Sequence, residues 1–221
     1  MSVSCFTIVN LMREKSKIET SKKLQDAINE QINFELYSAC VYLSMATWLE
    51  SRNLSGMGHW MEVQVQEEYA HAMRFYRHVV ERGGRVILKE MRAPKTEWSS
   101  LLEVFEDALA HESEVTRRIH KIGEIADEEG DRAAQSMLSW FYDERVEEEA
   151  QIGEIRDLLK MTGDNLAALL HINAKLGARA PMSPPPAEST APQPLLRAIK
   201  KRLKSLARFF WQQLRTYVTA S

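Results

Sequence analysis

Disulfide-forming cysteines and long apolar runs are both missing from this sequence of 221 residues. Its two cysteines, Cys5 and Cys40, are too few for a disulfide framework or for a metal site built of thiolates. We therefore expect a protein of the reducing cytoplasm. The apolar segment at residues 3–12 is too short to span a bilayer, and it lacks the basic start and the cleavage site of a signal peptide.

Pro94 is the only proline before residue 181, whereas residues that favour helices, namely Ala, Glu, Leu, Lys and Arg, are common there. Apolar residues recur at helical spacing, which predicts an all-α fold. The expected helices cover about 21–50, 55–82, 96–126, 131–160 and, more briefly, 164–176. Ser55 and Thr96 are the expected N-caps of the second and third helices, and Gly83 and Gly163 are expected to end the second and fourth.

The lengths of the connections predict the topology. Short links at 51–54 and 128–130 make the helices on either side antiparallel neighbours. The link at 83–95 could stretch about 43 Å, at roughly 3.3 Å per residue, and so could run the length of a helix. Helices two and three would then be parallel. This predicts a four-helix bundle with one long crossover, followed by a short fifth helix.

Acidic residues are missing from residue 190 onwards, where seven basic ones remain, so the rest of the chain holds 22 basic and 31 acidic residues. Six prolines between 181 and 194 predict an extended linker. Residues 195–221 return to helical periodicity, with one apolar face and basic residues elsewhere. We expect this basic amphipathic helix to bind an anionic surface or cargo, such as a membrane or nucleic acid; the alternatives are a partner helix or the acidic body of the chain itself.

Each of the four long helices interrupts its apolar stripe with glutamate. The residues concerned are Glu35, Glu68 with His71 one turn later, Glu112, and Glu144 with Glu148. A lone glutamate on such a stripe usually reaches water at the edge of the core. Four at matched depth need a shared explanation, because a buried carboxylate is costly unless it is paired, protonated or bound to metal. Carboxylates with one imidazole in a bundle core suit two bridged iron ions. Tyr42, one heptad after Glu35, is either core packing or a redox residue beside the metals.

At these positions the chain resembles the non-haem ferritins of bacteria and archaea. The likeness runs from about residue 18 to 179, and its most specific stretches are NEQINFELYS at 29–38, QEEYAH at 66–71, AHE at 110–112 and WFYDERVEEE at 140–149. The resemblance covers the di-iron domain at 18–179, and it leaves the N-terminal extension at 1–17, the linker at 180–194 and the basic helix at 195–221 outside it. It also implies self-assembly, into a cage of 24 subunits.

The resemblance also implies a ligand set and an activity. One iron would take Glu35, Glu68 and His71, and the second would take Glu68 as a bridge with Glu112 and Glu148. A third, surface-directed position would correspond to Glu67, Glu144 and Glu147. The implied function is iron storage: the site oxidises Fe(II) with dioxygen or peroxide, and the ferric mineral is stored in the cage. Bacterioferritins carry a second Glu-x-x-His, whereas here Gln151 stands three residues after Glu148, where the second His would be. A symmetric di-iron site and inter-subunit haem are therefore not expected.

The sequence is compatible with two orientations of Arg145 and with more than one function. Ferritins of this type usually have glutamine at the position of Arg145. The guanidinium would either weaken iron binding at the second position or turn away and pair with Glu149. Two other functions also compete with iron storage. One is a di-metal oxidase that acts on an organic substrate. The other is a cage scaffold whose C-terminal helix is the functional part.

Overall fold

The computed structural model describes residues 20–163 and 165–180. The predicted N-terminal extension at 1–17, all but the first residue of the predicted linker at 180–194, and the predicted basic helix at 195–221 lie outside these residues. The described part contains helices and connecting segments, and no strand. The helices are α2 (Lys22–Glu50), α3 (Ser55–Glu81), α4 (Leu101–Glu128), α5 (Arg132–Thr162) and α6 (Leu166–Gly177). None of these helices is long and apolar enough to cross a bilayer.

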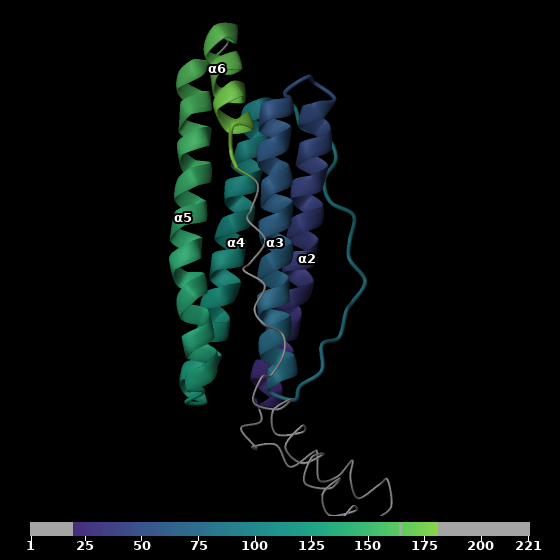
Figure 1. The fold of residues 1–221 in the computed structure, drawn as a ribbon, viewed down its shortest axis with the longest axis vertical. Helices are drawn as coiled ribbons and strands as arrows, with labels where there is room; N and C mark the ends of the chain where they lie inside the picture. Colours follow the sequence, from purple (N-terminus) through teal and green to yellow (C-terminus); the bar gives the residue numbers. More distant parts are fainter. Residues whose placement is uncertain (1–19, 164, 181–221) are drawn as a thin grey trace, which may run out of the picture. The chain divides into compact units, whose positions relative to one another are not determined.

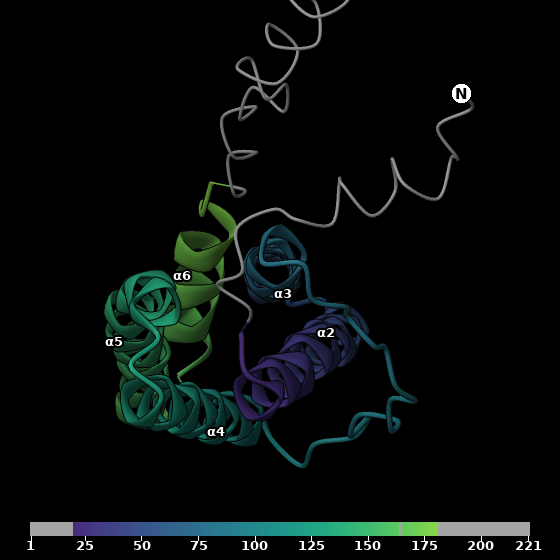
Figure 2. The same ribbon diagram turned by 90° about the horizontal axis from the view of Figure 1, so that it is seen from below.

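The four long helices form the predicted bundle, with α2 packed along α3 and α4 packed along α5 (Figures 1 and 2). The crossover between α3 and α4 runs beside α2 over its length, as Figure 1 shows. Side-chain amides of α2 fix this segment: Asn29 Nδ2 donates to the Arg85 carbonyl, and Asn33 Oδ1 accepts from the Lys89 amide. The crossover therefore makes α3 and α4 parallel. The predicted all-α bundle with one crossover and a short fifth helix is confirmed.

The fifth helix, α6, packs mainly on the start of α3. The approach is close enough to involve backbone atoms, because a Cβ added to Gly56 would lie 1.9 Å from the Asn173 carbonyl oxygen. Asn173 also accepts a hydrogen bond from the Met57 amide at 2.9 Å through its side chain. Glycine at position 56 is thus a requirement of the packing between α3 and α6.

Two of the expected helix starts were wrong. Ser55 is the first residue of α3 rather than its cap, and Leu54 at the cap position makes no side-chain cap bond. The third long helix begins after Ser100, whose hydroxyl accepts from the Glu103 amide, and not after Thr96. The cause is Trp98, which is buried and donates through Nε1 to Asp107. The expected ends at Gly83 and Gly163 are confirmed by their positive φ angles of 78° and 52°.

The core of the bundle consists of two apolar clusters with a polar layer between them. One cluster contains Tyr42, Met45 and Leu49 of α2 with residues from the start of α3 and α4, and the other contains Ile28, Phe75 and Phe141 with residues from the other bundle end. Along every long helix the two clusters are separated by buried charged residues, which are Glu35, Glu68, His71, Glu112, Arg145 and Glu148. These six residues are named the polar layer below.

Candidate metal centre

Each long helix contributes one fully or almost fully buried carboxylate to the polar layer. Glu35 comes from α2, Glu68 from α3, Glu112 from α4 and Glu148 from α5, and none is more than 4% exposed. Helical periodicity explains this placement, because each lies three or four residues, or seven, from apolar core residues of its own helix. The structure thus brings together Glu35, Glu68 and Glu112, which the sequence placed at one depth, and joins them with Glu148, which the sequence placed one turn deeper than Glu144.

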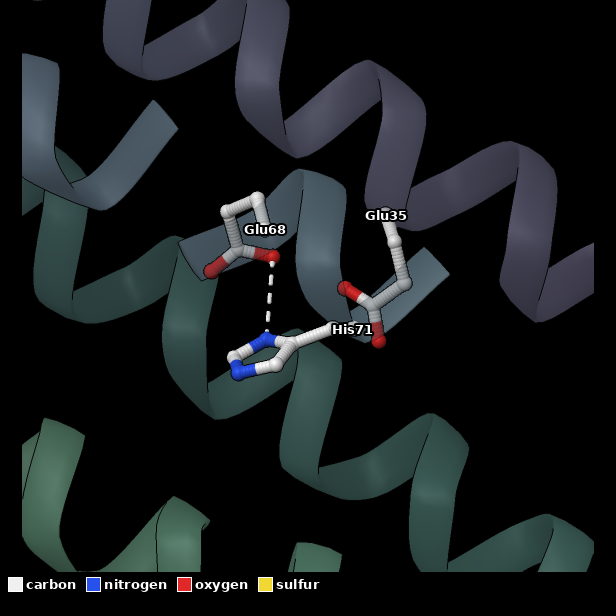
Figure 3. A group of neighbouring side chains, drawn as sticks. All are labelled: Glu35, Glu68 and His71. Carbon is white, nitrogen blue, oxygen red and sulfur yellow. Dashed lines mark ion pairs between the residues drawn. The ribbon is translucent and has the colours of Figure 1, made fainter. Parts of the chain in front are cut away.

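Figure 3 shows the first of the groups that could hold a metal ion. Glu35 of α2 and Glu68 and His71 of α3 point toward one another, and each offers a ligand atom within 4.8 Å of the others. His71 Nδ1 lies 3.7 Å from Glu68 Oε2, which is the dashed line in the figure. Neither oxygen of Glu68 accepts a well-formed hydrogen bond. A buried carboxylate without donors lacks a partner, and a metal ion would supply one.

Glu68 also belongs to a second group, with Glu112 and Glu148, whose ligand atoms again lie within 4.8 Å of one another. It is therefore the one residue shared by the two predicted iron positions. The Tyr42 hydroxyl donates a hydrogen bond to Glu112 Oε1. This contact places Tyr42 directly beside the second group and not merely in the apolar core.

Arg145 lies inside the polar layer. Its Nη1 is 2.5 Å from Glu112 Oε2, and its Nη2 forms an ion pair with Glu148 Oε2 and lies 3.4 Å from His71 Nδ1. The alternative in which Arg145 turns away toward Glu149 is therefore wrong. Glu149 instead accepts a hydrogen bond from the Thr116 hydroxyl. Arg145, and not Glu144 as the sequence indicated, occupies the buried stripe of α5, while Glu144 is half-buried.

Burial and mutual repulsion shift the protonation of the layer. Burial, followed by the charge of Glu68, raises the pKa of Glu35 to about 8. Burial likewise raises the pKa of Glu68 and of Glu112. Burial lowers the pKa of His71, so its imidazole is neutral near pH 7 and can act as a metal ligand. Burial also acts to lower the pKa of Arg145, but Glu112 and Glu68 raise it further, and the net shift is upward.

The predicted third position has a different environment. Glu67 receives two contacts from Arg179 Nη2, at 3.0 and 2.9 Å from its two oxygens. Glu147 accepts from Gln151 at 2.9 Å. Glu144 falls instead in a group with His71 and Glu148. Among the described residues no metal-capable group joins Glu67, Glu144 and Glu147, and this position stays a prediction.

Sequence reasoning missed two residues that act on these carboxylates. Gln31, which is buried one turn before Glu35, donates from Nε2 to Glu35 Oε1 at 2.9 Å. An amide four residues from a glutamate on the same apolar stripe was the available signal. Arg179 lies far along the chain from Glu67, and no local pattern connects the two residues.

The comparisons agree with this architecture. The family model of the ferritin-like domain matches residues 25–162. A bacterial non-heme ferritin from Staphylococcus saprophyticus is 39% identical over 160 residues, which is 72% of this chain and 96% of the relative. One from Staphylococcus aureus strain USA300 is 38% identical over 159 residues, again 72% and 96%.

Solved structures of ferritins are also similar to this chain. An open-pore ferritin from the archaeon Archaeoglobus fulgidus matches with a TM-score of 0.72 at 44% identity, over 73% of this chain and all of that one. An engineered closed form of that ferritin matches with a TM-score of 0.73 at 44% identity, over 74% and 100%. By its sequence, its fold and the carboxylates at its centre, this chain belongs to the ferritin family.

Proposed function

We propose that this chain is an iron-storage subunit that oxidises Fe(II) at its polar layer. The observation that carries the proposal is the pair of metal-capable groups that share Glu68: Glu35 with His71 on one side, and Glu112 with Glu148 on the other. Carboxylate oxygens with one imidazole suit iron. The iron ions are the substrate, two per subunit, and a third at Glu67, Glu144 and Glu147 would require Arg179 to release Glu67.

The chemistry is a two-electron oxidation. Each Fe(II) gives up one electron, and the two electrons together reduce dioxygen to peroxide, or peroxide to water. Glu68 would bridge the ions, and Glu35, His71, Glu112 and Glu148 would complete their ligands. Tyr42, whose hydroxyl donates to Glu112, is placed to supply a further electron beside the second ion. Burial of these carboxylates supports small inorganic reactants over an organic substrate.

Storage requires a container, and we propose that the chain assembles with copies of itself into a cage of 24 subunits. Membership of the ferritin family supports this assembly. Ferric product would leave the polar layer and form mineral inside the cage.

Oxygen uptake by the anaerobically prepared protein on addition of Fe(II) tests the proposed activity. We expect rapid uptake and a ferric absorbance band, while native mass spectrometry should show a large closed assembly. A particle of large mass without oxygen uptake would favour the scaffold hypothesis. Oxygen uptake by a monomer or dimer would favour a di-metal oxidase for another substrate.

The C-terminal residues 195–221, which lie outside the described residues, are proposed to bind an anionic surface or cargo. Their seven basic residues and lack of acidic ones support this role. Deletion from Pro181 onwards should leave assembly and iron oxidation intact and abolish binding to phosphatidylserine vesicles or single-stranded DNA. A truncated protein that binds these probes as the full chain does, or that fails to assemble, would contradict the role.

A further inference from the structure

We propose that Arg145 is a built-in cation that occupies the second metal position, so that the chain binds one divalent ion tightly and a second only when this guanidinium is displaced. The inference rests on the proposed function, because it concerns the same carboxylates. It is nevertheless tested by counting bound ions, which does not depend on iron oxidation.

The contacts of Arg145 define the position it occupies. The three carboxylates of the second group are Glu68, Glu112 and Glu148, and the guanidinium pairs with two of them. Arg145 is on α5. Its Nη1 pairs with Glu112 of α4 and its Nη2 pairs with Glu148, one turn further along α5, so the guanidinium lies between the two residues that a second ion would bind. A metal ion at this position would therefore compete with Arg145 for Glu112 and Glu148, which are its two ligands other than Glu68.

The first position makes fewer direct contacts with Arg145. Of Glu35, Glu68 and His71, only His71 contacts Arg145, at the long distance of 3.4 Å between Nη2 and Nδ1. Both oxygens of Glu68 and one oxygen of Glu35 are buried with neither a hydrogen-bond partner nor an ion pair to Arg145, whereas Glu148, whose oxygens also lack a well-formed hydrogen bond, is ion-paired with Arg145. The free oxygens of Glu68 and Glu35 remain available to a first ion while Arg145 stays where it is. The two positions of this chain are therefore unequal before any metal binds.

The charge balance leads to the same conclusion. The four buried glutamates, when ionised, carry four negative charges, which two divalent ions would neutralise. One ion together with the guanidinium leaves one negative charge, whereas two ions with the guanidinium leave an excess positive charge. A protonated glutamate can release its proton to a metal, but an arginine cannot lose its charge at ordinary pH. Because this permanent charge is paired with Glu112 and Glu148, Arg145 must move away from them before a second ion binds well.

The test is a titration of the apo protein with Co(II), followed by calorimetry and by the visible absorbance of the bound ion. Ions that are lost in a Glu68→Ala variant are assigned to the polar layer, which separates them from ions elsewhere in the assembly. We expect one tight ion per chain in the parent, with a second at least 100-fold weaker. In Arg145→Gln, two ions should bind with affinities within about tenfold of each other.

Two further variants separate the causes. Arg145→Met removes the charge without adding a ligand atom, and it should also admit the second ion if charge and occupancy are responsible. Arg156→Gln, on the same helix, removes an arginine that pairs with Asp157 outside the layer, and its titration should match the parent. An anomalous map of the Co(II)-soaked parent at one equivalent should place the ion beside His71, with Arg145 still against Glu112.

Two equally tight ions in the parent would overturn the inference, and this measurement needs no variant to fold. A single ion in both Arg145→Gln and Arg145→Met would overturn it as well. The inference and the proposed function fail separately. If no oxygen is taken up but the number of bound ions changes as expected, only the proposed oxidation activity is contradicted. If oxygen uptake is normal but the parent binds two ions tightly, only the role of Arg145 is contradicted.

Discussion

Arg145 Nη1 lies 2.5 Å from Glu112 Oε2, and this ion pair joins α5 to α4 in the middle of the core. Both side chains are almost fully buried, at 2% and 0% exposure. Arg145 is the only permanent cation among the buried residues of the described part of the chain. It therefore stabilises a layer of carboxylates that would otherwise repel one another, at the place where metal ions would do the same.

Arg145→Gln should destabilise the metal-free protein by about 3 kcal/mol, because removing one partner of a buried ion pair leaves Glu112 and Glu148 uncompensated. Saturating Co(II) should restore most of this loss, because the ions then supply the missing positive charge. The measurement is guanidinium denaturation at one fixed protein concentration, with chelator or with Co(II). Equal losses in both conditions would show that Arg145 is a structural residue without a link to the metal.

Glu68→Ala should reduce the initial rate of Fe(II) oxidation more than any other single replacement in the polar layer, because only Glu68 belongs to both of the groups proposed to hold the two irons. Stability should change little, since the deletion relieves repulsion from Glu112 and the lost oxygens accept no well-formed hydrogen bond. Stopped-flow absorbance at two irons per subunit gives the rate. Glu62→Ala, an exposed change on the same helix, is the matched control. A rate equal to that of the control would contradict the bridging role.

The stability of the metal-free protein should fall as the pH rises from about 5 to 8. Burial raises the pKa of Glu35 to about 8, so in this range the folded state holds a proton that the unfolded chain has already released. The stabilisation by protonated Glu35 is complete below the pKa of Glu35 in the unfolded chain. It is lost as the pH approaches 8 and does not change further above that pH. Glu35→Gln should make this decline shallower in thermal unfolding with chelator present. A decline of unchanged steepness would show that Glu35 does not hold the proton.

Gly56→Ala should weaken the packing of α6 on α3. The added Cβ would lie 1.9 Å from the Asn173 carbonyl oxygen, which is a backbone atom, so the two helices must separate. We expect a loss of about 2 kcal/mol and faster amide hydrogen exchange in α6. Gly153→Ala on α5 is the matched control, because no atom lies within 4 Å of its added Cβ. It should be neutral or stabilising by up to about 1 kcal/mol. Similar exchange in both variants would contradict the close approach.

Sequence patterns were sufficient for the topology, because the apolar stripes set the helices and the link lengths set their directions. They failed where a distant contact decides the outcome. Thr96 does not cap a helix because Trp98 is held in the core near Trp48. The buried position of Arg145 follows from the spacing of Phe141, Arg145, Glu148 and Ile152, but burying a guanidinium also requires Glu112 from another helix. Local spacing contains no information about that partner.

The most direct test of the account is the anomalous diffraction of crystals soaked anaerobically with Fe(II) and measured at the iron edge. We predict an iron peak bonded to Glu35, Glu68 and His71 at low iron. At high iron we predict a second peak, between Glu68, Glu112 and Glu148, which appears together with movement of Arg145. Soaked crystals with iron bound elsewhere and no peak beside Glu68 would contradict the assignment of the polar layer as the metal centre.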